Sequence, residues 1–492
     1  MMPMKRALSA VVVTNVCVSA LATLFLGGCL TAGPDYKPPT VGTPTNWNAR
    51  VAGAIRVGAL DPAALSQWWS VFGDPVLADL VASAQRNNRD VKQAEARLRE
   101  TRARRLLAGA ERMPTLAVDA SASRSRRSEQ ADSSVTTSTY ANGLDASWEL
   151  DLFGAKRRAV ESAEASLQAS QEALHDVTVS LLAEVALNYV QYRSCQVRLA
   201  IVGTNLAAQS ETYDITRWRC EANLVTQLDV DQARASLEQT RAELPLLRTS
   251  LDQAEHQLAT LLGEAPGNLR SRLDAGPSSV PIAASELAVG VPADVLRQRP
   301  DVRGAERRLA AQTAQIGMAA AARYPDLTLS GSIGVEALAL GDLYTAGALT
   351  AQGLMKAGLT VFDGGRIRQS IAIQTALQEE ALAAYEAAVL AALKEVEDAL
   401  VAYVNERTRQ RALQEAVAAG ESAFRLARDK YESGLIDFQT VLSTQQSLLT
   451  VQNTLAFSQA DVTSDLIRLY KALGGGWTPS ASDADAGKTA IE

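Results

Sequence analysis

The chain has 492 residues, a formal net charge of −7 and 5% aromatic residues, with only two histidines and four cysteines. The negative balance leaves no basic footprint for nucleic acid. Neither His175 nor His256, both on helical stretches, belongs to a recognisable catalytic set. We therefore expect no enzyme, no nucleic-acid partner, no metal and no cofactor. The abundant alanine, leucine and glutamate are typical of long helices.

The N-terminus predicts a lipoprotein signal peptide over residues 1–28. Lys5 and Arg6 precede an apolar stretch that ends at Leu26 and is followed by two glycines. Cys29 comes directly after Leu-Gly-Gly and resembles the cysteine of a bacterial lipobox, which is lipidated and becomes the first residue of the mature protein. A covalent lipid on Cys29 is the one added group that we expect. An uncleaved membrane anchor is the alternative.

An internal repeat organises the rest of the chain. Residues 154–263 match residues 365–474 at a constant offset of 211 residues with no net gap. The same offset holds upstream, where Asp90 matches Asp301. Further matched pairs are Glu184 with Glu395, Tyr192 with Tyr403, Arg217 with Arg428 and Leu262 with Leu473. Such a repeat indicates one structural unit used twice, which need not bury its own apolar face.

The repeat and the local composition set the expected boundaries of the parts. Sequence rich in proline and glycine predicts an extended tether after Cys29 and a linker between the repeats. The expected parts are a signal peptide at 1–28; a lipidated tether and equatorial segment at 29–74; a first repeat at 75–263, with a helix near 75–110, a β-hairpin at 115–152, a long helix at 155–219 and a return helix at 226–262; a linker at 264–290; a second repeat at 291–474, with a helix, a β-hairpin at 326–361, a long helix at 366–432 and a return helix at 437–473; and a tail at 475–492. We expect the adjacent Trp68 and Trp69 to pack against a neighbouring element.

Alternating sequence predicts the β-hairpin of each repeat. In the first, Leu116 and Val118 alternate with polar residues, a polar run over 124–139 is expected to form the loop, and alternation resumes at Leu144. Segments of about ten residues that are apolar on one face suit membrane-spanning strands. A soluble hairpin with one wet face would look alike.

Closure of these strands into a barrel needs more than one chain. About eight strands make the smallest common closed barrel, and four cannot close. Open edges cannot face lipid, because their N–H and C=O groups would have no partner. If the strands span a membrane, several chains share one barrel, and three chains would supply twelve strands.

A long helix follows each hairpin. The helix expected at 155–219 would reach about 95 Å at 1.5 Å per residue. Apolar or small residues recur in it every seven positions in two separate rows. Two rows indicate a neighbour on each side, as in a tube of helices, and an ordinary two-stranded coiled coil is the alternative.

Short turns are expected to join each long helix to its return helix. Asn223 and Gly434 occupy equivalent positions, and both residue types tolerate left-handed backbone. Pro245 is expected to interrupt the first return helix as a kink. The spacing of Cys195 and Cys220, both on helical stretches, suggests no disulfide framework.

Several motifs together resemble bacterial outer-membrane efflux lipoproteins of the TolC, OprM and NodT type. They are the lipobox, Gly33-Pro34-Asp35-Tyr36, the stretch from Trp148 to Gly154, Arg299-Pro300-Asp301-Val302, Tyr431 with Gly434, and the stretch from Leu469 to Trp477. The resemblance implies a mixed α and β membrane protein in which a tandem structural repeat gives four transmembrane β-strands and long coiled-coil helices per chain. It further implies a homotrimer with a 12-stranded outer-membrane β-barrel continued by a periplasmic α-barrel.

The resemblance also implies a function and a set of partners. Such proteins are passive exit ducts of tripartite efflux systems for small toxic compounds or drugs. Their partners are a periplasmic adaptor (membrane fusion protein), an inner-membrane pump, commonly of the resistance-nodulation-division (RND) class, and outer-membrane lipid. Leu30, rather than an aspartate after Cys29, favours sorting to the outer membrane. Family topology places the loop with Arg124, Arg126 and Arg127 outside, where it could pair with lipopolysaccharide phosphates or simply be solvated.

The periplasmic turns are where the resemblance implies a gate. Ser443 stands where the family often has an aspartate, and Gln439 stands where a bulky apolar residue is usual, so this sequence departs from the usual aperture. The nearby acids Asp437, Asp229 and Asp231 are candidates for a cation-attracting ring. Solvated acids at helix starts are the alternative.

Two further functions stay open. A duct for type I protein secretion would share the fold, although the lipobox and the Leu-Gly-Gly-Gly-Trp ending favour drug efflux. A lipid-anchored periplasmic coiled-coil scaffold belongs to a different class, and the four amphipathic strands argue against it.

Overall fold

The computed structural model describes residues 31–48, 55–57, 62–129, 133–283, 287–290 and 292–478. The predicted signal peptide, the predicted lipidation site Cys29 and the tail from residue 479 lie outside these residues. The chain divides into two compact units. The first holds the described residues up to Pro39, Arg99–Ala169 and Ala305–Tyr385, and the second holds Thr40–Leu98, Ser170–Gly304 and the described residues from Glu386 onward. None of the described helices is both long and apolar enough to cross a membrane.

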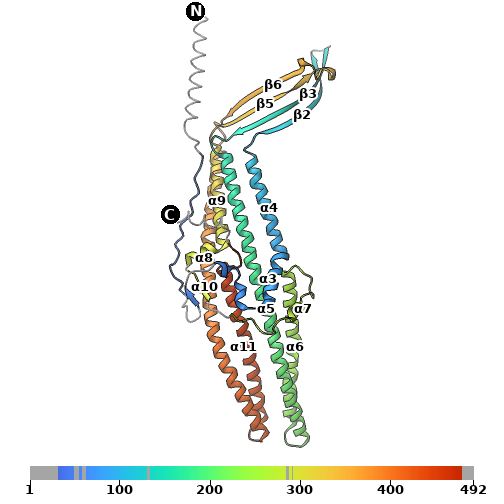
Figure 1. Ribbon diagram of the computed structural model, residues 1–492, viewed down its shortest axis with the longest axis vertical. Helices are drawn as coiled ribbons and strands as arrows, with labels where there is room; N and C mark the ends of the chain where they lie inside the picture. The colour runs from blue at the N-terminus through green and yellow to red at the C-terminus, as the bar shows by residue number, and fades with distance from the viewer. Residues whose placement is uncertain are drawn as a thin grey trace, which may run out of the picture. The chain divides into compact units, whose positions relative to one another are not determined.

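An antiparallel sheet of four strands forms the first unit's most regular part (Figure 1). The strands are β2 (Thr115–Glu129), β3 (Ser133–Leu150), β5 (Asp326–Ala337) and β6 (Leu349–Gly358), in the order β2-β3-β5-β6. Each repeat gives one hairpin, and the β3–β5 pairing joins the two. Among the strands that the structure describes, the outer strands β2 and β6 each pair with a single neighbour.

The faces of the sheet are chemically distinct. Leu144 lies opposite Val118 in β2 and Ile333 in β5, so these apolar side chains share one face. All three are exposed in the single chain. On the other face Asp145 lies opposite Ser332. The predicted alternation is therefore present, with one apolar and one polar face.

The strands of the first hairpin are longer than predicted. The expected loop over 124–139 is wrong, because β2 continues to Glu129 and β3 begins at Ser133. The physical reason is that strand pairing uses the backbone: Arg124 pairs with Ser138 whatever the polarity of the side chains. The threonines in this part of β3 also favour extended backbone. Arg124, Arg126 and Arg127 thus lie in a strand and not in a loop.

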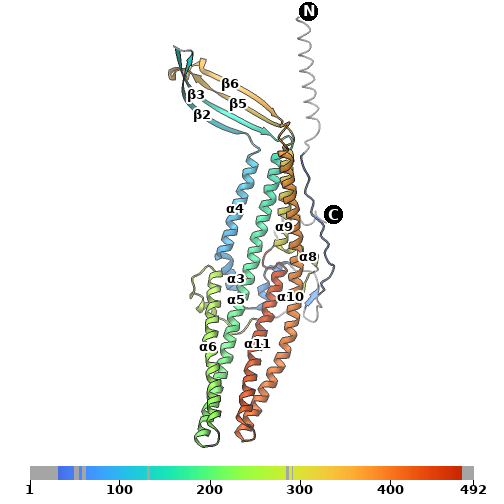
Figure 2. The same ribbon diagram turned by 180° about the vertical axis from the view of Figure 1, so that it is seen from behind.

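Four long helices have matching lengths in the two repeats. They are α5 (Ala155–Glu221) and α10 (Arg366–Glu432), each of 67 residues, and α6 (Gln227–Leu261) and α11 (Phe438–Ala472), each of 35. In both views α6 runs beside the lower part of α5, and α11 beside that of α10 (Figures 1 and 2). The predicted helices are confirmed to within two residues at each end.

The turns between these helices have the predicted backbone. Asn223 (φ 58°) and Gly434 (φ 72°) are both left-handed. Pro245 does not end α6, which runs through this residue as one helix. A proline has no N–H to donate within a helix, but its carbonyl can still accept a hydrogen bond. The Pro245 carbonyl accepts one from the Thr249 hydroxyl at 3.0 Å.

The first helix of each repeat is broken in two. The prediction of one helix near 75–110 is wrong: α3 (Pro75–Asn87) ends and α4 (Arg89–Ala110) begins around Asn88. The Asn88 side-chain oxygen accepts the N–H groups of Asp90 and Val91, and its amide donates to the Leu261 carbonyl at 2.8 Å. Asn88 therefore starts α4 and holds the end of α6.

The second repeat breaks its helix at the equivalent position. There α8 (Pro292–Gln298) gives way to α9 (Pro300–Ala321) at Arg299. Arg299 is buried and donates to the Ala472 carbonyl at 2.9 Å, as Asn88 does to its own return helix. Two different side chains thus perform the same task at equivalent places.

The tether and the linker contain more structure than predicted. β1 (Ile55–Val57) pairs in parallel with β4 (Leu287–Val289), and the short helices α2 (Pro62–Ser66), η1 (Trp68–Phe72) and α7 (Arg270–Asp274) also fall in these stretches. Segments this short carry no clear periodicity, which explains the omission. Trp68 is buried and stacks on Tyr470 at 5.5 Å, so its predicted packing role is confirmed.

Candidate functional site

The first tip, where α5 turns into α6, is closed by a capping box. The Thr226 hydroxyl accepts the Asp229 N–H at 3.4 Å, and the Asp229 carboxylate accepts the Thr226 N–H at 2.9 Å. The same carboxylate accepts the Thr226 hydroxyl proton at 2.8 Å. Two N–H groups that would otherwise lack a partner at the helix start are thereby satisfied.

The second tip, where α10 turns into α11, uses the same residue types in exchanged places. Asp437 is the N-cap and accepts both the Thr440 N–H at 2.9 Å and its hydroxyl at 2.6 Å. Asp437 is equivalent to Thr226, and Thr440 to Asp229. Hydrogen bonds from the hydroxyl and N–H of Thr440 lower the pKa of Asp437 below its ordinary value.

The five predicted aperture residues all lie at these two tips. Asp229 is half-buried, and Asp231, Asp437, Gln439 and Ser443 are exposed in the single chain. Asp229 completes the capping box of α6 and Asp437 is the N-cap of α11. Ser443 donates its hydroxyl to the Thr440 carbonyl at 3.0 Å. Within the described residues, the Asp231 carboxylate accepts a side-chain amide from Gln227 at 3.2 Å and takes no part in a cap.

An aromatic cluster at the second tip escaped the sequence analysis. Tyr431 and Phe438 are buried with their ring centroids 5.6 Å apart, and Ala233 of helix α6 packs in the same cluster. Arg219, at the end of α5, donates to the Tyr431 carbonyl at 3.2 Å and holds its guanidinium 4.5 Å from the ring centroid. These contacts tie the two tips together. The signal was Phe438 itself, an apolar residue directly after a helix cap.

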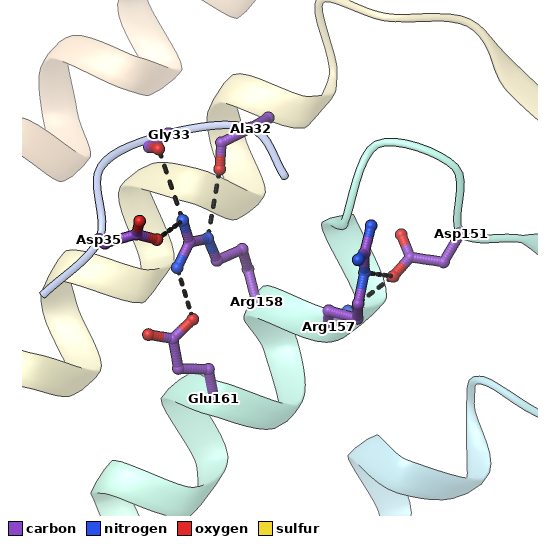
Figure 3. A network of polar contacts seen from close by, with 7 residues as sticks. All are labelled: Ala32, Gly33, Asp35, Asp151, Arg157, Arg158 and Glu161. Atoms are coloured by element: carbon purple, nitrogen blue, oxygen red, sulfur yellow. Dashed lines mark hydrogen bonds and ion pairs between the residues drawn. The ribbon is translucent and has the colours of Figure 1, made fainter. Parts of the chain in front are cut away.

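A second polar network lies in the first unit, at the corner between β3 and α5. The Asp151 carboxylate accepts the N–H groups of Lys156 and Arg157 and so begins α5. Arg157 points to Asp151, whereas Arg158 points the other way (Figure 3). These adjacent arginines therefore bind different segments of the chain.

Arg158 binds the segment that follows the predicted lipidation site. Its guanidinium donates to the Ala32 carbonyl at 3.2 Å, the Gly33 carbonyl at 3.4 Å, and the Asp35 and Glu161 carboxylates at 2.6 and 2.7 Å (Figure 3). Burial would lower the pKa of the Arg158 guanidinium, but the hydrogen bonds to Glu161 and Asp35 outweigh burial and raise it. Arg158 is thus a charged clamp on this segment.

His175 has a packing role in the second unit. Its ring stacks on Trp477 with centroids 4.4 Å apart, and its Nδ1 lies 3.4 Å from the buried Glu172 carboxylate. The same carboxylate forms an ion pair with Arg303 at 2.6 Å. Across the part of the chain that the structure describes, no group of three or more histidine, cysteine or acidic residues is arranged to hold a metal.

The described residues thus combine an amphipathic four-stranded sheet, open at both edges, with long paired helices. The model of the outer membrane efflux protein family matches residues 80–264 and 291–475. The chain belongs to this family. The two matched ranges coincide with the two repeats.

Relatives and solved structures agree with the family match. Nodulation protein T of Rhizobium leguminosarum bv. trifolii is 33% identical over 93% of this chain and 97% of its own length. The solvent efflux pump outer membrane protein SrpC of Pseudomonas putida is 32% identical over 93% and 98%. The structure of the outer-membrane channel OprN superposes with a TM-score of 0.87 at 34% identity and covers 91% of this chain and 100% of its own.

These findings establish the class of function and the place of action. The protein is an outer-membrane component of an efflux system, with the fold predicted from its sequence, and it extends into the periplasm. Members of the family are channels.

Proposed function

We infer that three copies of this chain form one passive exit duct with a twelve-stranded barrel. The observation that carries this proposal is the sheet with its apolar face and with β2 and β6 as open edges. A lipid-facing sheet must have every backbone N–H and C=O paired, so each open edge calls for the edge of a neighbouring copy. Four strands are too few to close alone, and three copies reach a common barrel size.

The duct receives its cargo from a periplasmic adaptor and an inner-membrane pump of the RND class. The tips offer a surface for such an adaptor: Leu224 and the equivalent Leu435 are 67% and 72% exposed at the two turns, and Leu228 is 65% exposed beside them. Exposed apolar side chains at matched places suit a docking partner that covers them. The pump supplies the energy, and the cargo consists of small toxic compounds or drugs.

The gate of the duct lies at the tips. The Asp229 and Asp437 carboxylates accept N–H groups at the helix starts. Asp231 is therefore the acid best placed to attract cations to an aperture. Gln439 and Ser443 contribute polar, uncharged groups in the second repeat. In this proposal the acid of the aperture has moved from the second repeat to the first.

A lipid on Cys29 anchors each copy in the outer membrane, and no metal or other cofactor takes part. The lipobox-like sequence supports this anchor. The Arg158 guanidinium holds Ala32, Gly33 and Asp35, shortly after Cys29, and so gives the anchor a fixed starting point.

Cross-linking in intact membranes tests the proposed assembly. We expect the chain to co-purify as a heat-modifiable trimer together with an adaptor and an inner-membrane pump. In planar bilayers, Asp231→Asn should lower cation selectivity, while Ser443→Asn should leave it unchanged. A monomer in outer-membrane fractions would contradict the duct. Recovery of a secreted protein with the complex would favour type I secretion instead.

A further inference from the structure

Residues 31–36, here called the strap, are held to the first unit by more contacts than an ordinary tether makes. The Ala32 N–H donates to the Phe153 carbonyl at 3.0 Å. Arg158 binds two strap carbonyls and the Asp35 carboxylate, and only 4% of the Arg158 side chain is exposed. Charge-assisted hydrogen bonds to a nearly buried arginine are among the stronger polar contacts. The strap therefore has a built site.

The backbone of the strap also passes very close to α9. Gly33 has a φ of 83°, and a Cβ at this residue would lie 2.4 Å from the Gly317 Cα. A Cβ on Gly317 would in turn lie 2.9 Å from the Ala32 carbonyl oxygen. Two glycines thus allow a crossing that no other residue type would permit at this distance.

The far end of the strap is fixed by a tyrosine. The Tyr36 hydroxyl donates to the Glu306 carboxylate at 3.0 Å, and the Arg307 guanidinium lies 5.7 Å from the Tyr36 ring centroid. Burial, and then the neighbouring Glu306 charge, raise the pKa of the Tyr36 hydroxyl. The hydroxyl therefore keeps its proton and stays a donor. Both ends of the strap are held.

The strap begins only two residues after Cys29. Two residues of fully extended chain reach at most about 7 Å. The strap's first backbone contact is to Phe153, three residues after the end of β3 at Leu150. A lipid on Cys29 must then enter the membrane close to the end of that strand. A free, proline-rich tether would set no such limit.

We propose that the Arg158 clamp is an anchor-registration site, which holds the strap so that the lipid on Cys29 and the four-stranded sheet enter the same leaflet together. Arg158 is a positioning residue: it touches the strap and not the lipid. The partner is the periplasmic leaflet of the outer membrane. The inference rests on the proposed function, which supplies the lipid and the shared barrel.

The adjacent arginine provides a matched control. Arg157 pairs with Asp151 at 3.5 Å and makes its contacts away from the strap. Arg158→Ala should speed hydrogen exchange of the Ala32 amide, which donates to the Phe153 carbonyl, about tenfold to a hundredfold, as expected when the charge-assisted hydrogen bonds that hold the strap are lost. Arg157→Ala should leave this exchange unchanged. Arg158→Lys, which keeps the charge and loses the forked donors, should fall between them.

A double-mutant cycle separates registration from a merely structural role. The full-length chain is compared with a Cys29→Ala variant that is exported by a cleavable, non-lipoprotein signal. In the lipidated chain, Arg158→Ala should lower the yield of heat-modifiable trimer. In the unlipidated chain it should add no further loss, because there is no anchor to register. An equal loss in both backgrounds would overturn the proposal.

A longer segment between Cys29 and the strap tests the same proposal without changing any described residue. Insertion of six Gly/Ser residues between Leu30 and Thr31 should lower the trimer yield as Arg158→Ala does, while strap exchange stays normal. A normal yield would overturn registration. Palmitate labelling of every variant identifies the other failure: an unlabelled wild-type chain would overturn both the lipid anchor and the registration. If the labelled, trimeric wild-type protein conducts no ions in planar bilayers, that result counts against the duct and not against the registration.

Discussion

At the first tip Thr226 caps α6 and Asp229 completes the box, whereas at the second tip Asp437 caps α11 and Thr440 stands where Asp229 does. At both tips the N-cap side chain accepts the N–H three residues on, with the two residue types exchanged. The first tip adds the reciprocal bond from the Thr226 N–H to the Asp229 carboxylate, and the second adds the Thr440 hydroxyl as a donor to Asp437. We expect either order of the pair to support a helix start.

The interiors of the two tips differ more deeply. The second buries Tyr431 and Phe438, and the equivalent positions of the first hold Cys220 and Gln227. Two repeats with nearly the same backbone can therefore carry different side chains at equivalent positions of the tip, aromatic in one and not in the other. The second tip holds a small aromatic core, to which the first tip contributes Ala233 and Arg219.

Removal of the aromatic core should have the largest effect. Phe438→Ala is expected to destabilise the second tip by about 3 kcal/mol, the lower range for a buried phenylalanine. Gln227→Ala, at the equivalent exposed position, should change stability by less than about 0.5 kcal/mol. Hydrogen exchange of the first turns of α11 and α6 measures both. Similar losses at the two tips would contradict the difference drawn between them.

Loss of the link between the tips should come next. Arg219→Ala removes a hydrogen bond and a cation–π contact, which together are worth about 1–2 kcal/mol. Lys430→Ala, at the equivalent and exposed position of the second repeat, is the control. Because the link holds the second tip to the first, Arg219→Ala should also raise single-channel conductance. Unchanged conductance would show that the link does not restrain the gate.

The exchanged caps predict a smaller effect with a built-in rescue. Thr226→Ala should weaken the start of α6 by about 1 kcal/mol. The double variant Thr226→Asp with Asp229→Thr copies the order of the second tip. Its free energy of opening at the start of α6, measured by hydrogen exchange, should stay within about 0.5 kcal/mol of the wild-type value. If the double variant is as weak as Thr226→Ala, the two orders are not equivalent.

The smallest effect concerns pH. The pKa of Asp437 in the folded protein is lowered from its ordinary value of 3.8, chiefly by the hydrogen bond from the Thr440 hydroxyl. A lowered pKa stabilises the fold above the ordinary value, and this contribution is lost as pH falls through the lowered value. Protection of the α11 start should therefore fall below about pH 3.8. Asp437→Thr should remove this dependence, and a variant that retains it would assign the effect to another group.

The sequence predicts the repeated elements well because their signals are local. Helix periodicity, strand alternation and the left-handed turn residues Asn223 and Gly434 each occur within a short window. The break at Asn88 was missed, although the repeat carried the signal: Pro300 begins α9 at the position equivalent to Arg89. A second copy of a unit is therefore evidence about the first.

The candidate sites were predicted less well, because they depend on contacts between distant residues. The five candidate aperture residues lie near the helix turns, but only geometry reveals that the Asp229 and Asp437 carboxylates bond N–H groups at the helix starts. Arg158 and Asp35 are 123 residues apart, and no periodicity connects them. An arginine at the start of a long helix gives no sequence sign that it binds a segment so far upstream.

The open edges β2 and β6 have a kinetic consequence for the cell. If three copies close one barrel, then closure depends on encounters between protomers, and its rate falls steeply as the protein becomes scarce. Until they meet, single chains keep unpaired strand edges, which invite wrong pairing and proteolysis. Expression level would then act as a threshold: below it, synthesis feeds degradation, and above it, nearly every chain ends in a finished duct.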